Sequence, residues 1–140
     1  MKKVIILSAF ALASMGQFSC HSNKSVYQQT TENISSDFQS GYFDQHVKGN
    51  EYEVIYRGVK MNQNKVFDLS MLRAAEIAKN RGFKHFVVLS KVSESTQINK
   101  QKINSSALKV ALYNDVPAKY QTFYDAHAEY DRLTKKYNLK

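Results

Sequence analysis

The chain has little of what usually marks a catalytic or cofactor-binding site. Among its 140 residues are one cysteine, one proline, five glycines and no tryptophan. It contains no G-x-G-x-x-G or P-loop for phosphates, no G-x-S-x-G nucleophile motif, and no H-x-x-x-H or H-E-x-x-H spacing for a metal. A single cysteine also cannot form an internal disulfide. We therefore expect no catalytic residue, no metal site and no cofactor.

The chain is basic, with a formal charge of +8. Residues 1–19 contain Lys2 and Lys3 and no acid, so the remainder carries 8 − 2 = +6. Acidic residues are mixed among the basic ones, and this pattern is typical of a solvated surface rather than a nucleic-acid patch. We expect no nucleic acid as a partner. Attraction to anionic lipid headgroups is the more natural use of such a surface.

The first residues have the composition of an export signal. Two lysines follow Met1, and residues 4–15 are apolar apart from Ser8 and Ser14. This apolar run fits the 7–15 residues, roughly, of a signal peptide and is too short to cross a bilayer. Small residues then come at Gly16 and Ser19, directly before Cys20.

This arrangement resembles a lipoprotein signal, in which the cysteine thiol receives a diacylglycerol before cleavage and the new N-terminus is acylated. The resemblance implies a signal peptide over 1–19, lipid attachment at Cys20 and a location in the cell envelope. Several acyl chains give stable anchoring. Gln17 stands where that motif usually has leucine, and His21, rather than aspartate, implies the outer membrane in a Gram-negative source.

Two alternatives remain open at the N-terminus. Cleavage near residues 13–16 would release a soluble exported protein with a free thiol, and absence of cleavage would leave an uncleaved anchor. In each case residues 20–40, rich in Ser, Gln, Thr and Asn, are expected to form a polar tether. Residues 41–140 then form a single domain.

Alternating and helical spacings predict the first elements of that domain. Residues 51–57 alternate as a half-buried strand, with a further edge strand near 41–47. Residues 66–81 have helical spacing, with Asp68 as the N-cap or a first-turn acid and Leu72 at the margin of the apolar stripe. Residues 83–91 are β-branched and aromatic, as in a central strand.

The second half is predicted to contain a loop, a strand and a helix. The polar residues 92–105 indicate a hairpin loop or a long connection, and 107–113 alternate as a strand. A C-terminal helix is expected to begin near Pro117, with its apolar stripe starting at Phe123. The β-α-β-β-α order favours an α+β domain, with a small mixed or antiparallel sheet and helices on one face.

Four blocks of residues carry a family resemblance. They are Gly41-Tyr42-Phe43-Asp44, then Tyr52-x-Val54-x-Tyr56-x-Gly58, Leu72-Arg73-Ala74-Ala75-Glu76, and Gly82-Phe83-x-x-Phe86. In this order they resemble the core of a family of uncharacterised bacterial lipoproteins, which reads Gly-Tyr-Ser-Asp, Tyr-x-Val-x-Phe-x-Gly, Leu-Leu-Arg-Ala-Ala-Glu and Gly-Tyr-x-x-Phe. The resemblance covers about residues 41–130. It implies an exported lipoprotein with an α+β domain and no known enzymatic activity.

A few polar residues are candidates for an interaction site. Arg73 and Glu76 are three residues apart on the predicted helix, so they share a face. They form either a recognition site or an exposed ion pair within the helix. Tyr42 and Asp44 either line a small pocket or form a packed ring beside a turn. His46, His85 and His127 are too scattered for a metal signature, and we expect structural roles for His85 and His127.

These observations favour a non-catalytic envelope domain that binds an unidentified partner protein. A small-ligand or envelope-stress sensor with a pocket between sheet and helix is the alternative. A hydrolase with no visible motif is a third class. A large exposed apolar patch would favour the first, and a closed cleft with convergent polar groups would favour the others.

Overall fold

The computed structural model describes residues 26–31 and 38–139 and has an α+β fold. None of the helices in this part of the chain is long and apolar enough to cross a membrane. In chain order the elements are β1 (Gly41–Lys48), β2 (Glu51–Val59), α1 (Gln63–Asn80), β3 (His85–Ile98), β4 (Gln101–Tyr113), β5 (Tyr124–Asp125) and α2 (Ala126–Lys136).

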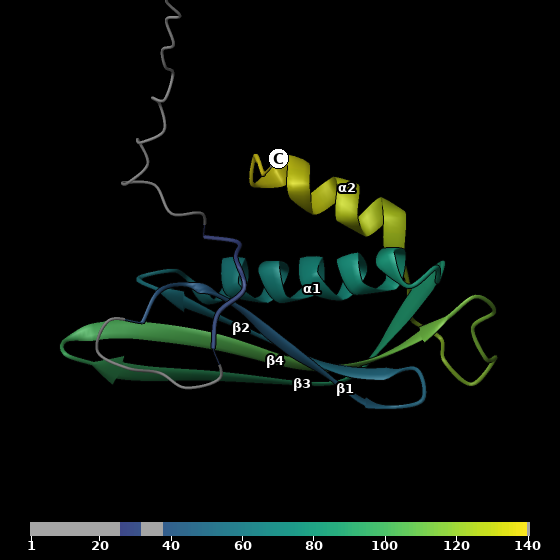
Figure 1. Ribbon diagram of the computed structural model, residues 1–140, viewed down its shortest axis with the longest axis horizontal. Helices are drawn as coiled ribbons and strands as arrows, with labels where there is room; N and C mark the ends of the chain where they lie inside the picture. The colour runs from purple at the N-terminus through teal and green to yellow at the C-terminus, as the bar shows by residue number, and fades with distance from the viewer. Residues whose placement is uncertain (1–25, 32–37, 140) are drawn as a thin grey trace, which may run out of the picture.

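The five strands form one antiparallel sheet in the order β1-β2-β4-β3-β5. Because β2 and β3 are both antiparallel to β4, they run parallel to each other with β4 between them. Helix α1 connects these two parallel strands and crosses one face of the sheet (Figure 1). This confirms the predicted fold class, with helices on one face.

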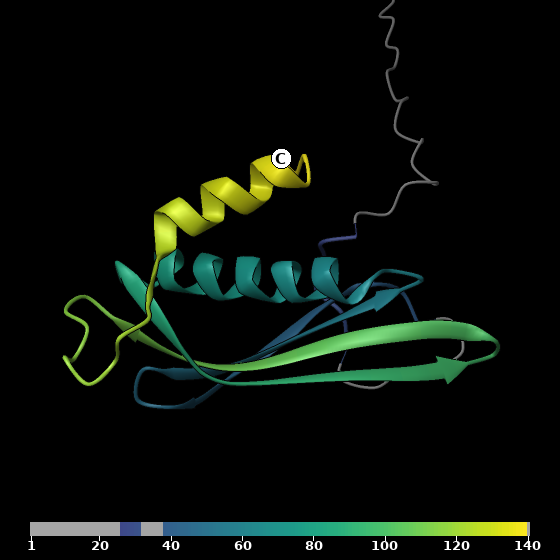
Figure 2. The ribbon, with the colours of Figure 1, turned by 180° about the vertical axis from the view of Figure 1, so that it is seen from behind.

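The domain has three layers, because α2 lies on the outer side of α1 and not on the sheet (Figures 1 and 2). Helix α1 is therefore enclosed on two sides. This explains why Leu72, predicted at the margin of the apolar stripe, is completely buried. Small side chains allow close approach on both sides, and Ala74, Ala75 and Ala78 are fully buried as well.

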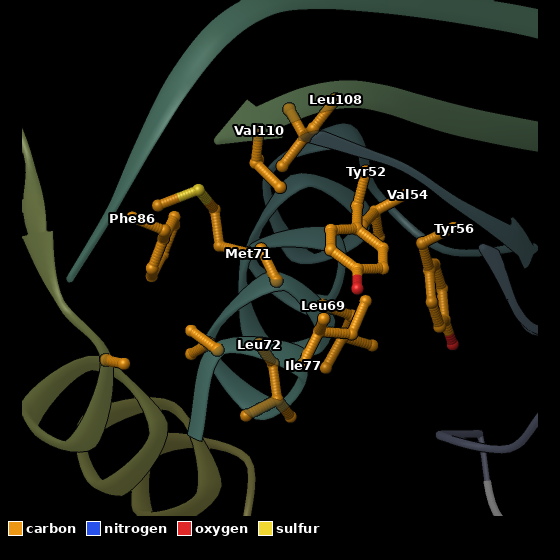
Figure 3. Close-up of a cluster of buried hydrophobic side chains, with 14 of the residues drawn as sticks. Tyr52, Val54, Tyr56, Leu69, Met71, Leu72, Ile77, Phe86, Leu108 and Val110 are labelled. Carbon is orange, nitrogen blue, oxygen red and sulfur yellow. The ribbon is translucent and has the colours of Figure 1, made fainter. Parts of the chain in front are cut away.

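The core lies between α1 and the sheet. On β2 the alternation predicted from the sequence places Tyr52, Val54 and Tyr56 toward the helix. Figure 3 shows these three side chains facing those of α1, with Phe86 of β3 beside Met71. One polar contact crosses the core, since the hydroxyl groups of Ser70 and Ser106 lie 2.9 Å apart.

The start of α1 differs from the prediction. The helix begins at Gln63, and its N-cap is Asn62, whose side-chain oxygen accepts a hydrogen bond from the backbone N–H of Lys65 at 2.8 Å. Asp68 is not the cap but fixes the second helix to the first. Its carboxylate accepts hydrogen bonds from the Tyr137 hydroxyl at 2.6 Å and from Lys136 at 2.8 Å.

The prediction of a loop or connection over residues 92–105 is wrong. Strands β3 and β4 continue through it as a hairpin, paired from Val92 and Ala107 out to Ile98 and Gln101. On its other side β4 pairs with β2 as far as Ile103 and Val59. The turn places Asn99 and Lys100 at φ of 51° and 67°, the left-handed conformation of a tight hairpin turn. The polar composition was misleading because residues 92–97 of β3 are all exposed, so this half of the hairpin needs no apolar alternation.

The C-terminal helix begins later than predicted. Residues 117–123 form a connection, and α2 begins at Ala126 with Asp125 as its N-cap, accepting a hydrogen bond from the Ala128 N–H at 2.8 Å. Phe123 lies before the helix and is 47% exposed. The helical stripe therefore reaches the core through Ala126 and Leu133.

We predict that Leu133→Ala lowers the free energy of unfolding by about 2–5 kcal/mol, because it leaves a cavity where α2 packs on α1. Urea denaturation followed by circular dichroism measures this change. Arg132→Ala is the control on the same helix, since its ion pair with Glu129 is at the surface and should contribute less than about 1 kcal/mol. Equal effects of the two substitutions would contradict the assigned packing of α2.

Candidate functional site

Residues 26–31, which fall within the expected tether, lie against the edge of the sheet. The Thr30 N–H donates to the Tyr42 carbonyl at 2.7 Å, and the Tyr42 N–H donates to the Gln28 carbonyl at 2.8 Å. Gln29 thus forms a parallel bridge with β1. The Tyr56 hydroxyl also donates a hydrogen bond to the Val26 carbonyl. We call residues 26–31 the N-terminal segment.

A glycine permits this close approach. A Cβ atom at Gly41 would lie 2.5 Å from the carbonyl oxygen of Gln28, closer than side-chain carbons come to a backbone oxygen. Any other residue at this position would push the N-terminal segment away from β1. Gly41 was expected to open the domain, and here it allows the preceding chain to pair with the domain as well.

Arg73 of α1 is the centre of a half-buried ionic cluster. Its Nε donates to Asp44 of β1 at 2.6 Å, and its Nη1 donates to Glu76 of α1 at 2.8 Å. The guanidinium carbon lies 4.3 Å from the centroid of the Tyr42 ring. Arg73 therefore joins the helix to the edge strand through two carboxylates and one ring.

Tyr27 connects the N-terminal segment to this cluster. Its hydroxyl donates to the Glu76 carboxylate at 2.6 Å, and its ring centroid lies 4.9 Å from that of Tyr42. Glu76 thus accepts hydrogen bonds from both Tyr27 and Arg73. We refer to Tyr27, Tyr42, Asp44, Arg73 and Glu76 as the clamp.

The pKa values in the clamp follow from burial and contact. Burial raises the pKa of Tyr27 well above its ordinary value, and the hydrogen bond to Glu76 raises it further. Burial alone would lower the pKa of Arg73, but its hydrogen bonds to Asp44 and Glu76 outweigh this effect and raise it. Within the clamp, Tyr27 is therefore neutral and Arg73 is charged.

A cleft adjoins the clamp at the end of α1. It has a volume of about 170 Å³ and is lined by Asp44, Tyr52, Arg73, Ile77, Asn80 and Arg81. The Arg81 guanidinium lies 5.4 Å from the Tyr52 ring centroid. Sites for drug-sized ligands measure about 300–1,000 Å³. This cleft can hold ordered water or a small ion.

The histidines do not converge in the described part of the chain. His85 begins β3 with its ring edge-on to Phe123 at 5.2 Å, and its Nδ1 has no hydrogen-bond partner among the described residues. His46 at the end of β1 contacts the Gly49 carbonyl at 2.7 Å. Within residues 26–31 and 38–139, no group of three or more His, Cys, Asp or Glu side chains could hold a metal ion.

The four candidate residues of the domain, Tyr42, Asp44, Arg73 and Glu76, come together in one cluster. The Arg73–Glu76 pair is more than a surface ion pair within a helix. Arg73 also donates a hydrogen bond to Asp44, and Glu76 also accepts one from Tyr27. Cys20 lies outside the described residues. Sequence reasoning missed Tyr27 and the role of Gly41; an isolated aromatic residue in a polar stretch was the available signal for Tyr27.

The comparisons with known proteins returned no similarity. No family model, no curated protein and no solved structure matches the chain. The resemblance to bacterial lipoproteins therefore stays a prediction.

We predict that Gly41→Ala releases the N-terminal segment. The clash with the Gln28 carbonyl costs about 1–3 kcal/mol, so the Thr30 amide should exchange its hydrogen about tenfold faster or more. Hydrogen exchange read by mass spectrometry or NMR measures this rate. Val47→Ala, on the same strand and 42% exposed, should leave it unchanged, and an unchanged rate in Gly41→Ala would contradict the pairing.

We further predict a loss of stability above pH 10, roughly the ordinary tyrosine pKa. Because the pKa of Tyr27 is raised in the folded chain, the folded state keeps a proton that the unfolded chain loses. The stabilisation is complete below that pH and declines above it, by up to about 1.4 kcal/mol per pH unit. Urea denaturation across alkaline pH should show a shallower decline for Tyr27→Phe, and identical slopes would contradict this assignment.

Proposed function

We propose that this chain is an exported lipoprotein, held to a membrane through Cys20, and that its domain is a non-catalytic adaptor for a second envelope protein. The anchor rests on the signal-like residues 1–19 and the cysteine that follows them. The clamp supports a non-catalytic role, because its charged groups bond to one another and fasten the N-terminal segment to the domain.

The outer edge of β3 is the observation that carries the adaptor proposal. Only His85 and Phe86 pair with β5 on this edge, and within the described residues no strand lies beside the rest of β3. Residues 90–97 are all exposed. A long edge with unpaired N–H and C=O groups is the usual template for strand addition by a partner.

The exposed side chains of residues 90–97 on this edge are polar except for Val92, so they suit a polar partner strand that makes one apolar contact. The Lys91 Nζ lies 3.9 Å from the Phe67 ring of α1, so Lys91 points to the helical side of the sheet. Val92 alternates to the other side and is 53% exposed. Glu94 is on the same side as Val92, so a partner strand meets an apolar residue and a carboxylate on the face away from α1.

By contrast, the opposite edge is partly occupied. The N-terminal segment pairs with β1 around Tyr42, and this pairing blocks a second strand from adding there. The two edges of the sheet thus differ, and the exposed edge of β3 belongs to the β3–β4 hairpin that extends beyond α1 (Figure 2). A partner strand would bind there without disturbing the core.

One experiment in the native host tests both parts of the proposal. A photoreactive amino acid at Ser95 is expected to form a cross-link to an envelope protein, whereas the same amino acid at Asp115, exposed in the loop after β4, should not. The intact mass of the membrane-purified protein is expected to correspond to a chain beginning at Cys20 with added acyl groups, and Cys20→Ser should lack them.

The two readouts can fail separately. An unacylated chain in the soluble fraction would overturn the anchor. Cross-links of equal yield and identity from both positions, or none from Ser95, would overturn the adaptor role of the β3 edge.

A further inference from the structure

Six lysines gather at the end of the domain where α1 begins and α2 ends. They come from the β2–α1 connection, the first turn of α1, the β3–β4 turn with the start of β4, and the last turn of α2. Two contacts link neighbouring members of this set: the Lys60 N–H donates to the Lys102 carbonyl at 3.0 Å, and the Lys65 Nζ lies 5.4 Å from the Tyr137 ring centroid at the end of α2. We call this set the basic end: Lys60, Lys65, Lys100, Lys102, Lys135 and Lys136.

Most of this charge is not neutralised within the described residues. Lys136 pairs with Asp68 at 2.8 Å. Lys60, Lys100, Lys102 and Lys135 are exposed, and no ion pair to another described residue involves them. The basic end therefore presents an excess of positive charge to whatever lies within a Debye length of about 8–10 Å.

The chain leaves the domain toward its N-terminus on this same side. The Val26 carbonyl accepts a hydrogen bond from the Tyr56 hydroxyl of β2, three residues before the end of this strand at Val59. Figure 1 shows the N-terminal segment beside the first half of α1, with the C-terminal end of α2 above it. The route from Cys20 into the domain thus ends close to the basic end.

Fixing the N-terminal segment shortens the connection to the anchor. Only residues 21–25 separate Cys20 from Val26. Even fully extended, six steps of the chain reach about 20 Å. Pairing of the N-terminal segment with the domain thus leaves a shorter connection than the expected tether over 20–40.

We propose that the basic end docks on the anionic lipid headgroups of the membrane that holds Cys20. This proposal rests on the proposed lipid anchor, which brings the surface within reach. Each lysine near an anionic surface strengthens association about fivefold. Docking in this orientation directs the opposite end of the domain, with Lys48, Lys84 and Lys119, away from the lipid.

The single cysteine allows a test that does not depend on lipidation in the cell. The mature chain from Cys20 is coupled through its thiol to a maleimide lipid, in vesicles of phosphatidylcholine alone or with about one third phosphatidylglycerol. Lysine acetylation is then measured by mass spectrometry. On the anionic vesicles Lys100, Lys102 and Lys135 are expected to react about tenfold more slowly than on neutral ones, and Lys48, Lys84 and Lys119 at equal rates.

A matched pair of variants separates docking from net charge. In the Cys20→Ser background, the triple variant Lys100→Gln, Lys102→Gln, Lys135→Gln should bind anionic vesicles about a hundredfold more weakly. The triple variant Lys48→Gln, Lys84→Gln, Lys119→Gln removes the same charge from the other end, and we expect a loss of less than about fivefold. Flotation of the protein with the vesicles measures both.

The docking of the basic end and the lipid anchor at Cys20 can fail separately. Equal losses in the two triple variants, or equal acetylation on the two kinds of vesicle, would overturn the docking orientation. Protection of the basic end in a protein that carries no acyl group in its native host would leave docking intact and overturn the anchor.

Discussion

The enclosure of α1 between the sheet and α2 is the constraint on which the rest of the structure depends. A helix with solvent on one side needs a single apolar stripe, but α1 buries the consecutive residues Ser70, Met71 and Leu72, which point in directions about 100° apart. Its alanines keep both neighbouring layers close enough for dense packing. Asp68 adds a polar connection to Tyr137 and Lys136 at the far end of α2.

Because α1 is held on two sides, its remaining side can support the clamp. Arg73 and Glu76 project from a helix that cannot shift, so Asp44 of β1 and Tyr27 of the N-terminal segment meet groups at set positions. Half-buried groups of opposite charge, each with a hydrogen-bond partner, avoid the cost of an unpaired buried charge. The clamp thus extends the ordered unit back to Val26, beyond the expected domain boundary at residue 41.

Pairing of the N-terminal segment with β1 makes the two edges of the sheet different. The N-terminal segment pairs with the β1 edge, whereas beyond His85 and Phe86 no strand in the described part of the chain pairs with the outer edge of β3. The basic end lies beside the point where the chain enters the domain.

Periodicity predicted the half-buried strand at 51–57 and the central helix, because each must bury one regular side against a core. It failed for residues 92–105, since residues 92–97 of β3 are all exposed and have no apolar period to detect. The spacing of Arg73 and Glu76 was visible as a shared helix face, but their partners come from 29 and 49 residues away.

The sequence by itself determined the α+β class, the apolar side of β2 and the signal-like N-terminus, because each depends on residues close together in the chain. Only the tertiary structure decided the second buried face of α1, the position of β3 near the edge of the sheet and the hydrogen bond from Tyr27 to Glu76. These depend on which distant segments pack together, and no local pattern specifies that choice.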